Sequence, residues 1–471
     1  MFADNSSLLN VEAFRNWDVR NVHCISGMFA NCISLQSVQP LNNWTTTNLG
    51  ELEYTFDNCK SLKGRIDLSN WDLSNLCSRW SESLRYYYKD NETHTASLYH
   101  SFNLEHFINN CPEVIGVTLG KGTFGKEKIT VSGYQGLFVA NCPKLRYVDL
   151  SGCTDPYNNV ASVSRQTQKT MFYTVPRTTV IYLPSGNTQP TEGDLENVVY
   201  TDESELLQCD KYYSEDKVDI ELPHRFHADL ATYERPFSKT YGGVILPYPV
   251  KINDDASDEF QPFILQEEYV EQMFFKGSDN VPANTPFVFK RKGSTDMKFA
   301  MEDVWVESTY DISGETSDNI DPTFTAWKSQ GFYVTHEIEP ENGKFNIPTM
   351  DDYVGTETVA YDPNRVYYIA SNKFYRTDPS TLYLDPHRIL YFGKWEKFSG
   401  DISGARPAAF TIEELDENSP AITAIQEAEL RLDESRAAAI YDASGNRLSE
   451  TKRGVNILRM ADGSVKKVLR K

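Results

Sequence analysis

The sequence predicts a multidomain, β-rich protein: an N-terminal repeat solenoid (α/β, or β with short helices), then a β-sandwich-like domain, then a small C-terminal β module. Three observations support this. The first residues repeat with a fixed period, the middle of the chain holds short aromatic and β-branched runs, and the C-terminus alternates such runs with turn residues. The 471 residues include 27 Tyr and 25 Phe but 8 Met, which favours strands over helical bundles.

The N-terminal repeat has a period of 27 residues and three apolar slots. A Phe slot is followed six residues later by a Leu slot, and nine residues after that by a Trp slot. One coil of this length cannot bury its apolar face alone, so we expect coils to stack with each slot on its counterpart in the next coil. The slots are occupied by Phe2, Phe29, Phe56, Leu8, Leu35, Leu62, Trp17, Trp44 and Trp71.

The repeat loosens after the third coil and then resumes. Residues 77–100 show no clean period, whereas Phe107 and Phe138 restart the pattern 31 residues apart. We therefore expect the solenoid to cover residues 1–190. Because Met1 opens in the middle of a coil, we expect the natural start to lie upstream, and the absence of a signal peptide does not argue against export.

The eight cysteines all lie in the first 209 residues, and none forms a C-x-x-C pair. Four of them, Cys32, Cys59, Cys111 and Cys142, follow Asn in similar contexts. A small secreted scaffold held together by disulfides is denser in cysteine. We therefore expect these four to fill a small buried slot of the repeat, in preference to disulfides or metal binding.

The segment from Met28 to Leu35 reads Met-Phe-x-x-Cys-x-Ser-Leu, an Asn-Trp pair follows at Trp44, and Cys-Pro units appear later at Cys111 and Cys142. These units resemble the BspA-like leucine-rich repeats, including their mycoplasma-lipoprotein variant. The resemblance implies a leucine-rich-repeat solenoid on a surface protein, especially of Bacteroidetes, and an adhesin-like role with no fixed ligand. The sequence departs from many relatives by carrying Trp in place of Phe.

Residues 194–412 contain strand-length runs bounded by Pro, Gly or Asp, with poor helical periodicity. They predict a β-sandwich-like module. Residues 226–250 resemble a β-rich module that follows the repeats in Bacteroidales surface proteins, a resemblance that implies no specific function. Residues 413–426 predict a linker. The clearest strand-length runs are residues 241–246, 285–290, 365–370 and 388–392.

Residues 427–471 alternate strand-like runs with Gly-containing turns and predict a small C-terminal β module. After Gly445 this tail carries eight Lys and Arg against two acidic residues. It resembles the C-terminal modules of Bacteroidetes surface proteins, some of which are type IX secretion sorting signals. A plain terminal β module is the alternative.

The charge balance excludes some classes of partner. The chain has 46 Lys and Arg against 67 Asp and Glu, a net charge of −21. An acidic protein repels phosphate backbones, so we expect no nucleic-acid partner. No stretch reaches the roughly 18–20 apolar residues of a membrane-spanning helix, so we expect no membrane-spanning segment.

Three motifs with ligand-binding residue types are better explained as structure. Residues 120–125 match G-x-G-x-x-G, but the next residues predict a strand where a dinucleotide site needs a helix, which indicates a turn between coils. His224, His227 and Asp229 are metal-ligand types, yet histidines three apart on a strand face opposite sides. The acidic run 254–259 lacks calcium-loop spacing. We expect no metal and no cofactor.

No G-x-S-x-G or H-E-x-x-H motif occurs, so we expect a non-enzymatic, adhesin-like binding protein at the cell surface or secreted. Its partner would be a host or bacterial surface protein or glycan, contacted by the solenoid. The candidate ligand contacts are four bulky aromatic residues in the polar insert. The alternative is that these rings cap or bridge the interrupted solenoid and contact no ligand. A passive surface spacer and a hydrolase hidden in the middle module remain alternatives. The ring residues are Trp80, Tyr86, Tyr87 and Tyr88.

Overall fold

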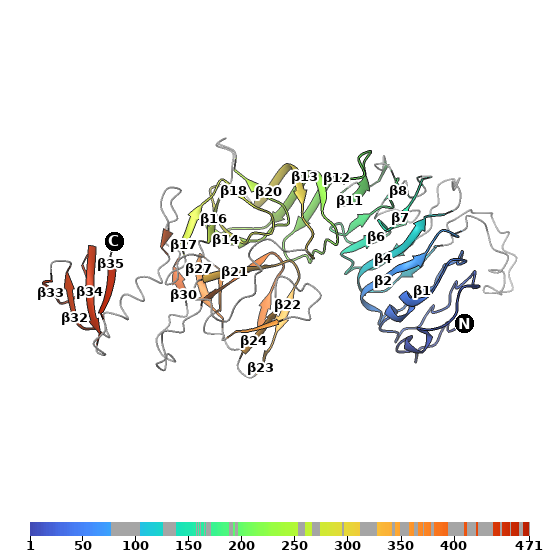
Figure 1. Cartoon of the computed structure of the whole chain (residues 1–471), viewed down its shortest axis with the longest axis horizontal. Helices are drawn as coiled ribbons and strands as arrows, with labels where there is room; N and C mark the ends of the chain where they lie inside the picture. Colours follow the sequence, from blue (N-terminus) through green and yellow to red (C-terminus); the bar gives the residue numbers. More distant parts are fainter. Residues whose placement is uncertain are drawn as a thin grey trace. The chain divides into compact units, whose positions relative to one another are not determined.

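The computed structural model describes most of the chain (Figure 1). It describes residues 1–471 except 77–103, 126–137, 157, 159, 161, 164, 166–170, 188–191, 194–195, 253–259, 266–273, 294–295, 311–326, 342–343, 349–357, 362–365, 371, 378–380, 394–408, 412–420, 423–436, 443–444, 453, 461–464 and 471.

The prediction of a β-rich protein with several sheets is confirmed. The helices in the described residues are two short 3-10 turns, η1 (Glu12–Phe14) and η2 (Gln39–Asn43). The chain divides into two compact units. The first comprises Met1–Glu234 with Lys298–Tyr310, and the second comprises Arg235–Met297 with Asp311–Lys471.

The largest sheet of the first unit, among the described residues, has nine strands. Its first four strands pair in parallel, and each comes from a successive coil of the repeat. In order across the sheet the strands are β2 (Lys63–Asp72), β4 (Glu113–Thr123), β6 (Tyr147–Asp149), β9 (Val180–Tyr182), β11 (Val198–Thr201), β12 (Leu207–Glu215), β13 (Phe226–Arg235) and β20 (Met297–Val306), with β7 (Cys153–Thr154) pairing with β4.

Two smaller parallel ladders also join successive coils. Phe56 pairs with Ile108, and Ile108 pairs with Val139, so the coils are stacked in register on this side as well. The equivalent turns of the first coils are bound by backbone hydrogen bonds, such as Phe29 N to Thr55 O over 3.0 Å. The ladders are β1 (Phe56–Asp57), β3 (Ile108–Asn109) and β5 (Val139–Ala140), and β8 (Ser162–Val163) with β10 (Glu192–Gly193).

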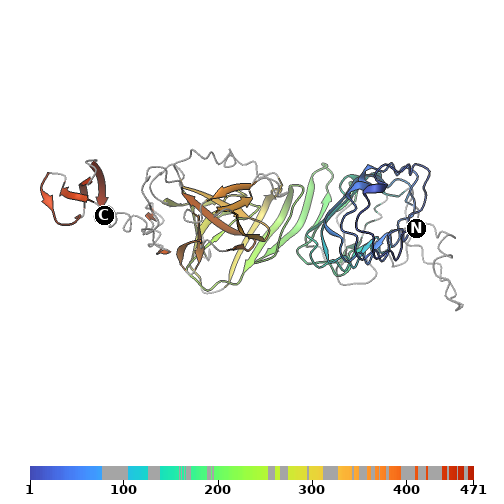
Figure 2. The same cartoon turned by 90° about the horizontal axis from the view of Figure 1, so that it is seen from below.

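One apolar core runs through the stacked coils and contains the Phe, Leu and Trp slot residues of the second and third coils. Phe2 and Leu8 of the first coil pack against it. The rings of Phe29 and Phe56 stack with centroids 5.6 Å apart, and those of Trp44 and Trp71 stack at 6.1 Å. Figure 2 shows the successive coils of residues 1–76 side by side. The 27-residue period therefore brings identical side chains into contact, as the sequence predicts.

The sheet continues without a break past residue 190. Val198 of β11 pairs in parallel with Ile181 of β9, and β12, β13 and β20 extend the same sheet. The connection between the parallel strands β12 and β13, residues 216–225, crosses one face of the sheet. The domain limits that the sequence predicts stay predictions.

The second unit contains two five-stranded sheets. Strands appear where the sequence predicts the runs 241–246, 285–290, 365–370 and 388–392. One sheet has the order β14 (Tyr241–Val244), β19 (Phe287–Arg291), β16 (Phe260–Leu265), β17 (Phe274–Gly277), β31 (Ala421–Ile422), and the other has the order β21 (Trp327–Phe332), β29 (Arg388–Gly393), β26 (Val366–Ala370), β27 (Lys373–Arg376), β30 (Ala409–Thr411).

Both of these sheets contribute to one aromatic core. Phe275 of β17 stacks on Phe374 of β27 at 5.7 Å, and Tyr391 of β29 packs edge-on against both rings. Short ladders complete the second unit, and Ile338, Phe345 and Leu382 of these ladders share a second apolar core with the sheet that contains β21, β26 and β29. The ladders are β15 (Val250–Lys251) with β18 (Asn280–Val281), β22 (His336–Ile338) with β28 (Leu382–Leu384), and β23 (Pro340–Glu341) with β24 (Lys344–Pro348) and β25 (Thr358–Tyr361).

The C-terminal residues form a four-stranded antiparallel sheet of their own. Its buried side chains include Ile440 and Leu458, which lie directly opposite each other on neighbouring strands. The order is β33 (Arg447–Leu448), β32 (Ala437–Asp442), β34 (Gly454–Met460) and β35 (Val465–Arg470).

Candidate functional site

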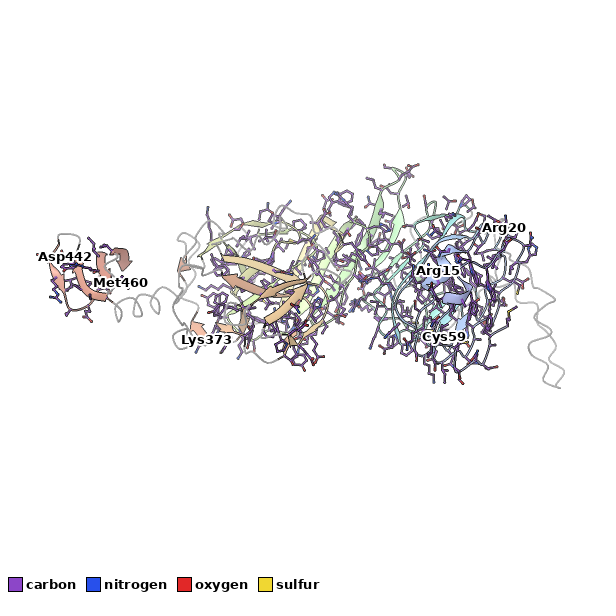
Figure 3. The ribbon with its side chains drawn as sticks, turned by 60° about the horizontal axis from the view of Figure 1, so that its bottom comes forward. Arg15, Arg20, Cys59, Lys373, Asp442 and Met460 are labelled. Atoms are coloured by element: carbon purple, nitrogen blue, oxygen red, sulfur yellow. The ribbon has the colours of Figure 1, made fainter. Side chains whose placement is uncertain are left out.

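The repeat slots are buried in the stacked coils, with an exception in the first coil. Trp17 is 39% exposed, and Phe2 and Leu8 are half-buried. The slot cysteines are buried free thiols, and Cys59 donates its S–H to the carbonyl oxygen of Phe29 over 3.2 Å. Cys59 is labelled in Figure 3. The fully buried slot residues are Phe29, Phe56, Leu35, Leu62, Trp44, Trp71, Cys32, Cys59, Cys111 and Cys142.

A ladder of side-chain amides joins the turns before the cysteines. Asn31 Nδ2 donates to Asp4 Oδ1 over 2.8 Å, Asn58 to Asn31 over 2.7 Å, and Asn110 to Asn58 over 2.8 Å. All four residues have positive φ, between 54° and 63°. Asn and Asp tolerate this left-handed conformation better than other residues with a side chain. The ladder therefore explains why Asn precedes Cys32, Cys59 and Cys111, whereas Asn141 before Cys142 donates to Asn109 instead.

The rings predicted to contact a ligand, Trp80, Tyr86, Tyr87 and Tyr88, lie outside the described residues. The Gly-rich motif is described: Gly120, Gly122 and Gly125 all have positive φ, between 66° and 81°. A Cβ atom on Gly120 would clash with the side chain of Leu73 in the preceding coil. Close packing between coils thus accounts for this glycine.

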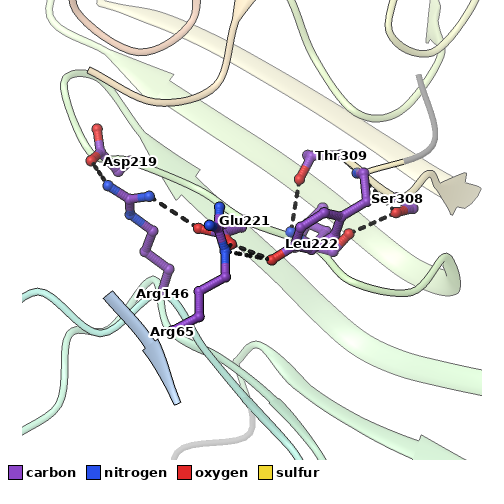
Figure 4. Close-up of polar contacts among 8 residues, drawn as sticks. Arg65, Arg146, Asp219, Glu221, Leu222, Ser308 and Thr309 are labelled. Carbon is purple, nitrogen blue, oxygen red and sulfur yellow. Dashed lines mark hydrogen bonds and ion pairs between the residues drawn. The ribbon is translucent and has the colours of Figure 1, made fainter. Parts of the chain in front are cut away.

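A buried ion cluster lies where the β12–β13 connection meets the repeat sheet (Figure 4). The carboxylate of Glu221 is fully buried and pairs with both Arg65 and Arg146, the latter over 3.0 Å. Arg146 also pairs with Asp219, and Tyr310 donates its hydroxyl hydrogen to Glu221. Residues more than 150 positions apart in the sequence are therefore joined through one carboxylate.

The electrostatics of this cluster are those of a closed, charge-balanced site. Burial alone would lower the pKa of Arg65, but the negative charge of Glu221 outweighs it and raises that pKa. Burial and the same carboxylate raise the pKa of Tyr310. A buried carboxylate with two cationic partners and a hydroxyl donor is satisfied and costly to disturb. The arrangement suits a structural clamp rather than a catalytic acid or base.

Nearby, His224 binds the repeat sheet through Asp149, with His224 Nε2 and Asp149 Oδ2 2.8 Å apart. Tyr182 donates its hydroxyl hydrogen to the carbonyl oxygen of His224 over 3.0 Å. Asp149 and Tyr182 lie on the face opposite to Val148, which packs in the repeat core. The connection therefore covers this part of the sheet face.

His227 points to the opposite side of the sheet from its neighbour Phe226. Phe226 packs on Tyr182 and Tyr212, whereas His227 meets Trp305 edge-on at 5.4 Å. Histidines 224 and 227 thus have different partners. Among the residues that the structure describes, no group of three His, Cys, Asp or Glu side chains is placed to hold a metal.

The residues around His227 form a polar and aromatic surface cluster on β12, β13 and β20. His227 Nδ1 lies 3.1 Å from Gln208 Oε1, and His227 Nε2 lies 3.0 Å from Asp303 Oδ1. The guanidinium carbon of Arg225 lies 4.2 Å from the ring centroid of Trp305. We call Gln208, Arg225, His227, Asp303 and Trp305 the Trp305 cluster.

The Trp305 cluster combines fixed and exposed groups. His227 lies within hydrogen-bond distance of Gln208 and Asp303 on the two neighbouring strands, while the side chain of Asp303 is 91% exposed. Asp303 has φ +55° inside β20, a left-handed residue within a strand. Such outliers persist where the surrounding structure holds them, and they cluster at functional sites. The sequence marks His227 only as a metal-ligand residue type that is better explained as structure, and Trp305 lies 78 residues further along the chain, so the sequence does not indicate their contact.

One family model matches part of the chain. It is described as "Mycoplasma protein of unknown function, DUF285" and matches residues 1–94. The match covers the three 27-residue repeats and agrees with the mycoplasma-type resemblance of those repeats. No curated protein and no solved structure matches the chain significantly. In the described part of the chain, none of the helices is long and apolar enough to cross a bilayer.

Proposed function

We propose that the chain is a non-enzymatic, adhesin-like binding protein, secreted or held at a bacterial cell surface, whose stacked repeats contact a protein or glycan of a host or another bacterium. The stacking in register of the coils carries this proposal, because it repeats the same turns and edges along an extended surface. The parallel pairing of β2, β4, β6 and β9 supports a leucine-rich-repeat-type solenoid of the BspA-like class found in Bacteroidetes.

The buried ion cluster offers no catalytic group to a substrate. Glu221 has no exposed surface and is bonded to Arg65, Arg146 and Tyr310, so a substrate has no access to this carboxylate. The connection also covers the sheet face at Asp149 and Tyr182. A ligand would therefore contact the turns and edges of the coils or the uncovered face of β12, β13 and β20.

Binding of the full chain to immobilised mucin, extracellular matrix proteins and oligosaccharides tests this proposal. Amide hydrogen exchange with and without the bound ligand then locates the contact. Saturable binding with protection within residues 1–234 or 298–310 would support the proposal. Protection confined to residues 235–297 and 311–471 would move the function to the second unit. The absence of saturable binding to every ligand tested would favour the passive spacer.

A further inference from the structure

We propose that the Trp305 cluster is a carbohydrate site that binds a neutral hexose or N-acetylhexosamine ring of a glycan. This inference rests on the proposed binding function and adds to it a site and a ligand class. The cluster lies on the face of β13 opposite to buried Phe226, and its residues come from β12, β13, β20 and the residue before β13.

The aromatic part of the site is packed on two sides. Trp305 and His227 lie on neighbouring strands with their rings edge-on at 77°, and the guanidinium of Arg225 lies over the indole at 4.2 Å. A pyranose ring has one face of C–H groups, and an indole buries such a face without losing hydrogen bonds. An aromatic ring on strands is better positioned for this contact than one on a loop.

The polar part of the site offers paired hydrogen-bonding groups around that ring. Asp303 presents an exposed carboxylate and Arg225 a guanidinium fork, while the amide of Gln208 bonds His227 and Asp202 and holds the histidine in place. The side chain of Arg225 is 57% exposed and its contact with Glu307 is long, at 3.8 Å, so a ligand can displace it from the indole. Adjacent sugar hydroxyls match the two-atom spacing of carboxylate and guanidinium groups.

The charge of the surface selects among ligands. Asp303 and Glu307 outnumber the cation Arg225 at the cluster, and the chain carries a net charge of −21. Sialylated or sulfated glycans would be repelled. A protein partner would need about 800 Å² of contact with an apolar centre. Charged groups surround the indole instead, so a neutral sugar fits best.

The test uses the full chain with a panel of oligosaccharides ending in galactose, mannose or N-acetylglucosamine, their sialylated forms, and the extracellular matrix proteins named above. Trp305→Ala is expected to weaken binding of the neutral oligosaccharide at least about tenfold, and Trp305→Phe by less. Asp303→Asn is expected to weaken it while leaving thermal unfolding unchanged. Tyr383→Ala is the matched control, because Tyr383 is 70% exposed and lies outside the cluster on β28.

Each outcome bears on the proposal. Loss of neutral-glycan binding in Trp305→Ala, with Tyr383→Ala like wild type, supports it. Glycan binding that Trp305→Ala leaves unchanged overturns the site, and binding to proteins but to no glycan overturns the ligand class, while both leave the proposed binding function standing. Failure of the wild-type chain to bind any glycan or protein on the panel overturns both. If Trp305→Ala unfolds the chain, Asp303→Asn decides.

Discussion

Trp71 donates its indole N–H to the carbonyl oxygen of Leu41 over 2.8 Å, thirty residues earlier in the sequence. Trp44 makes the same bond to Phe14, also over 2.8 Å. Each of these two tryptophans therefore satisfies a backbone carbonyl of the preceding coil, and their rings stack on each other. One residue type provides both the polar and the apolar contacts between coils, which explains its strict 27-residue spacing.

Replacing Trp71 tests this role. We expect Trp71→Phe to lower the free energy of unfolding by about 1–3 kcal/mol, because it removes a buried hydrogen bond and part of a stacked ring. Trp17→Phe is the control, since Trp17 occupies the same slot but is 39% exposed. Its expected cost is under about 1 kcal/mol, measured by the same denaturant unfolding. Equal losses in both variants would refute the role of coil stacking.

Asn58 occupies the middle of the amide ladder, donating to Asn31 and accepting from Asn110. We expect Asn58→Ala to cost about 1–3 kcal/mol, because it breaks both bonds and places Ala at φ +57°. Asn58→Gly keeps the backbone free of strain and should cost less. Chemical denaturation of the two variants separates the contribution of the side-chain hydrogen bonds from that of backbone strain. A Gly variant as unstable as the Ala variant would assign the whole loss of stability to the side-chain hydrogen bonds.

Glu221 is the centre of the buried ion cluster. We expect Glu221→Gln to destabilise the first unit by about 3–5 kcal/mol, because it leaves Arg65 and Arg146 without their shared carboxylate. Asp18→Asn is the control, since it breaks the exposed ion pair with Arg20, which Figure 3 labels, and should leave the unfolding temperature unchanged. A Glu221→Gln chain as stable as wild type would show that the clamp is dispensable.

The Asp149–His224 pair predicts a pH dependence. The hydrogen bond to Asp149 raises the pKa of His224 above 6.5 against the effect of burial, so its contribution is full below 6.5 and disappears as pH rises through the raised pKa. Burial would raise the pKa of Asp149, but its hydrogen bonds from His224 and Ser151 lower it below 3.8, so that its contribution disappears as pH falls through the lowered value. The pair stabilises most between pH 3.8 and 6.5.

Unfolding of wild type and His224→Gln at about pH 5.5 and about pH 8.5 measures this effect. The stability advantage of the wild-type chain should be larger at the lower pH. An advantage that is equal at both values, or larger at the higher pH, would contradict the assigned pairing.

The parts of the fold that depend on local sequence patterns were predictable from the sequence. The slots of Phe29, Leu35 and Trp44 recur at a fixed spacing, so the stacking of coils follows from the need of each coil to bury its apolar face. Strand-length runs in the second unit, such as residues 365–370, were predictable because they are rich in β-branched and aromatic residues and are bounded by turn residues on both sides.

The contacts between distant segments were not predictable. Glu221 meets Arg65 across 156 positions, and a single sequence contains no signal for that pairing. The continuation of the sheet from β9 to β11 spans the turn-rich residues 186–193, which composition alone indicates as a boundary. Trp305 joins the first unit only because β20 returns to pair with β13.

The proposed function requires that this chain binds a surface ligand without changing it. A titration of the immobilised chain with mucin and matrix proteins, followed by mass spectrometry of the recovered ligand, measures both properties at once. We expect saturable binding of at least one ligand and recovery of that ligand intact. Cleavage of the bound ligand, or the absence of saturable binding to every ligand tested, would refute the proposed function.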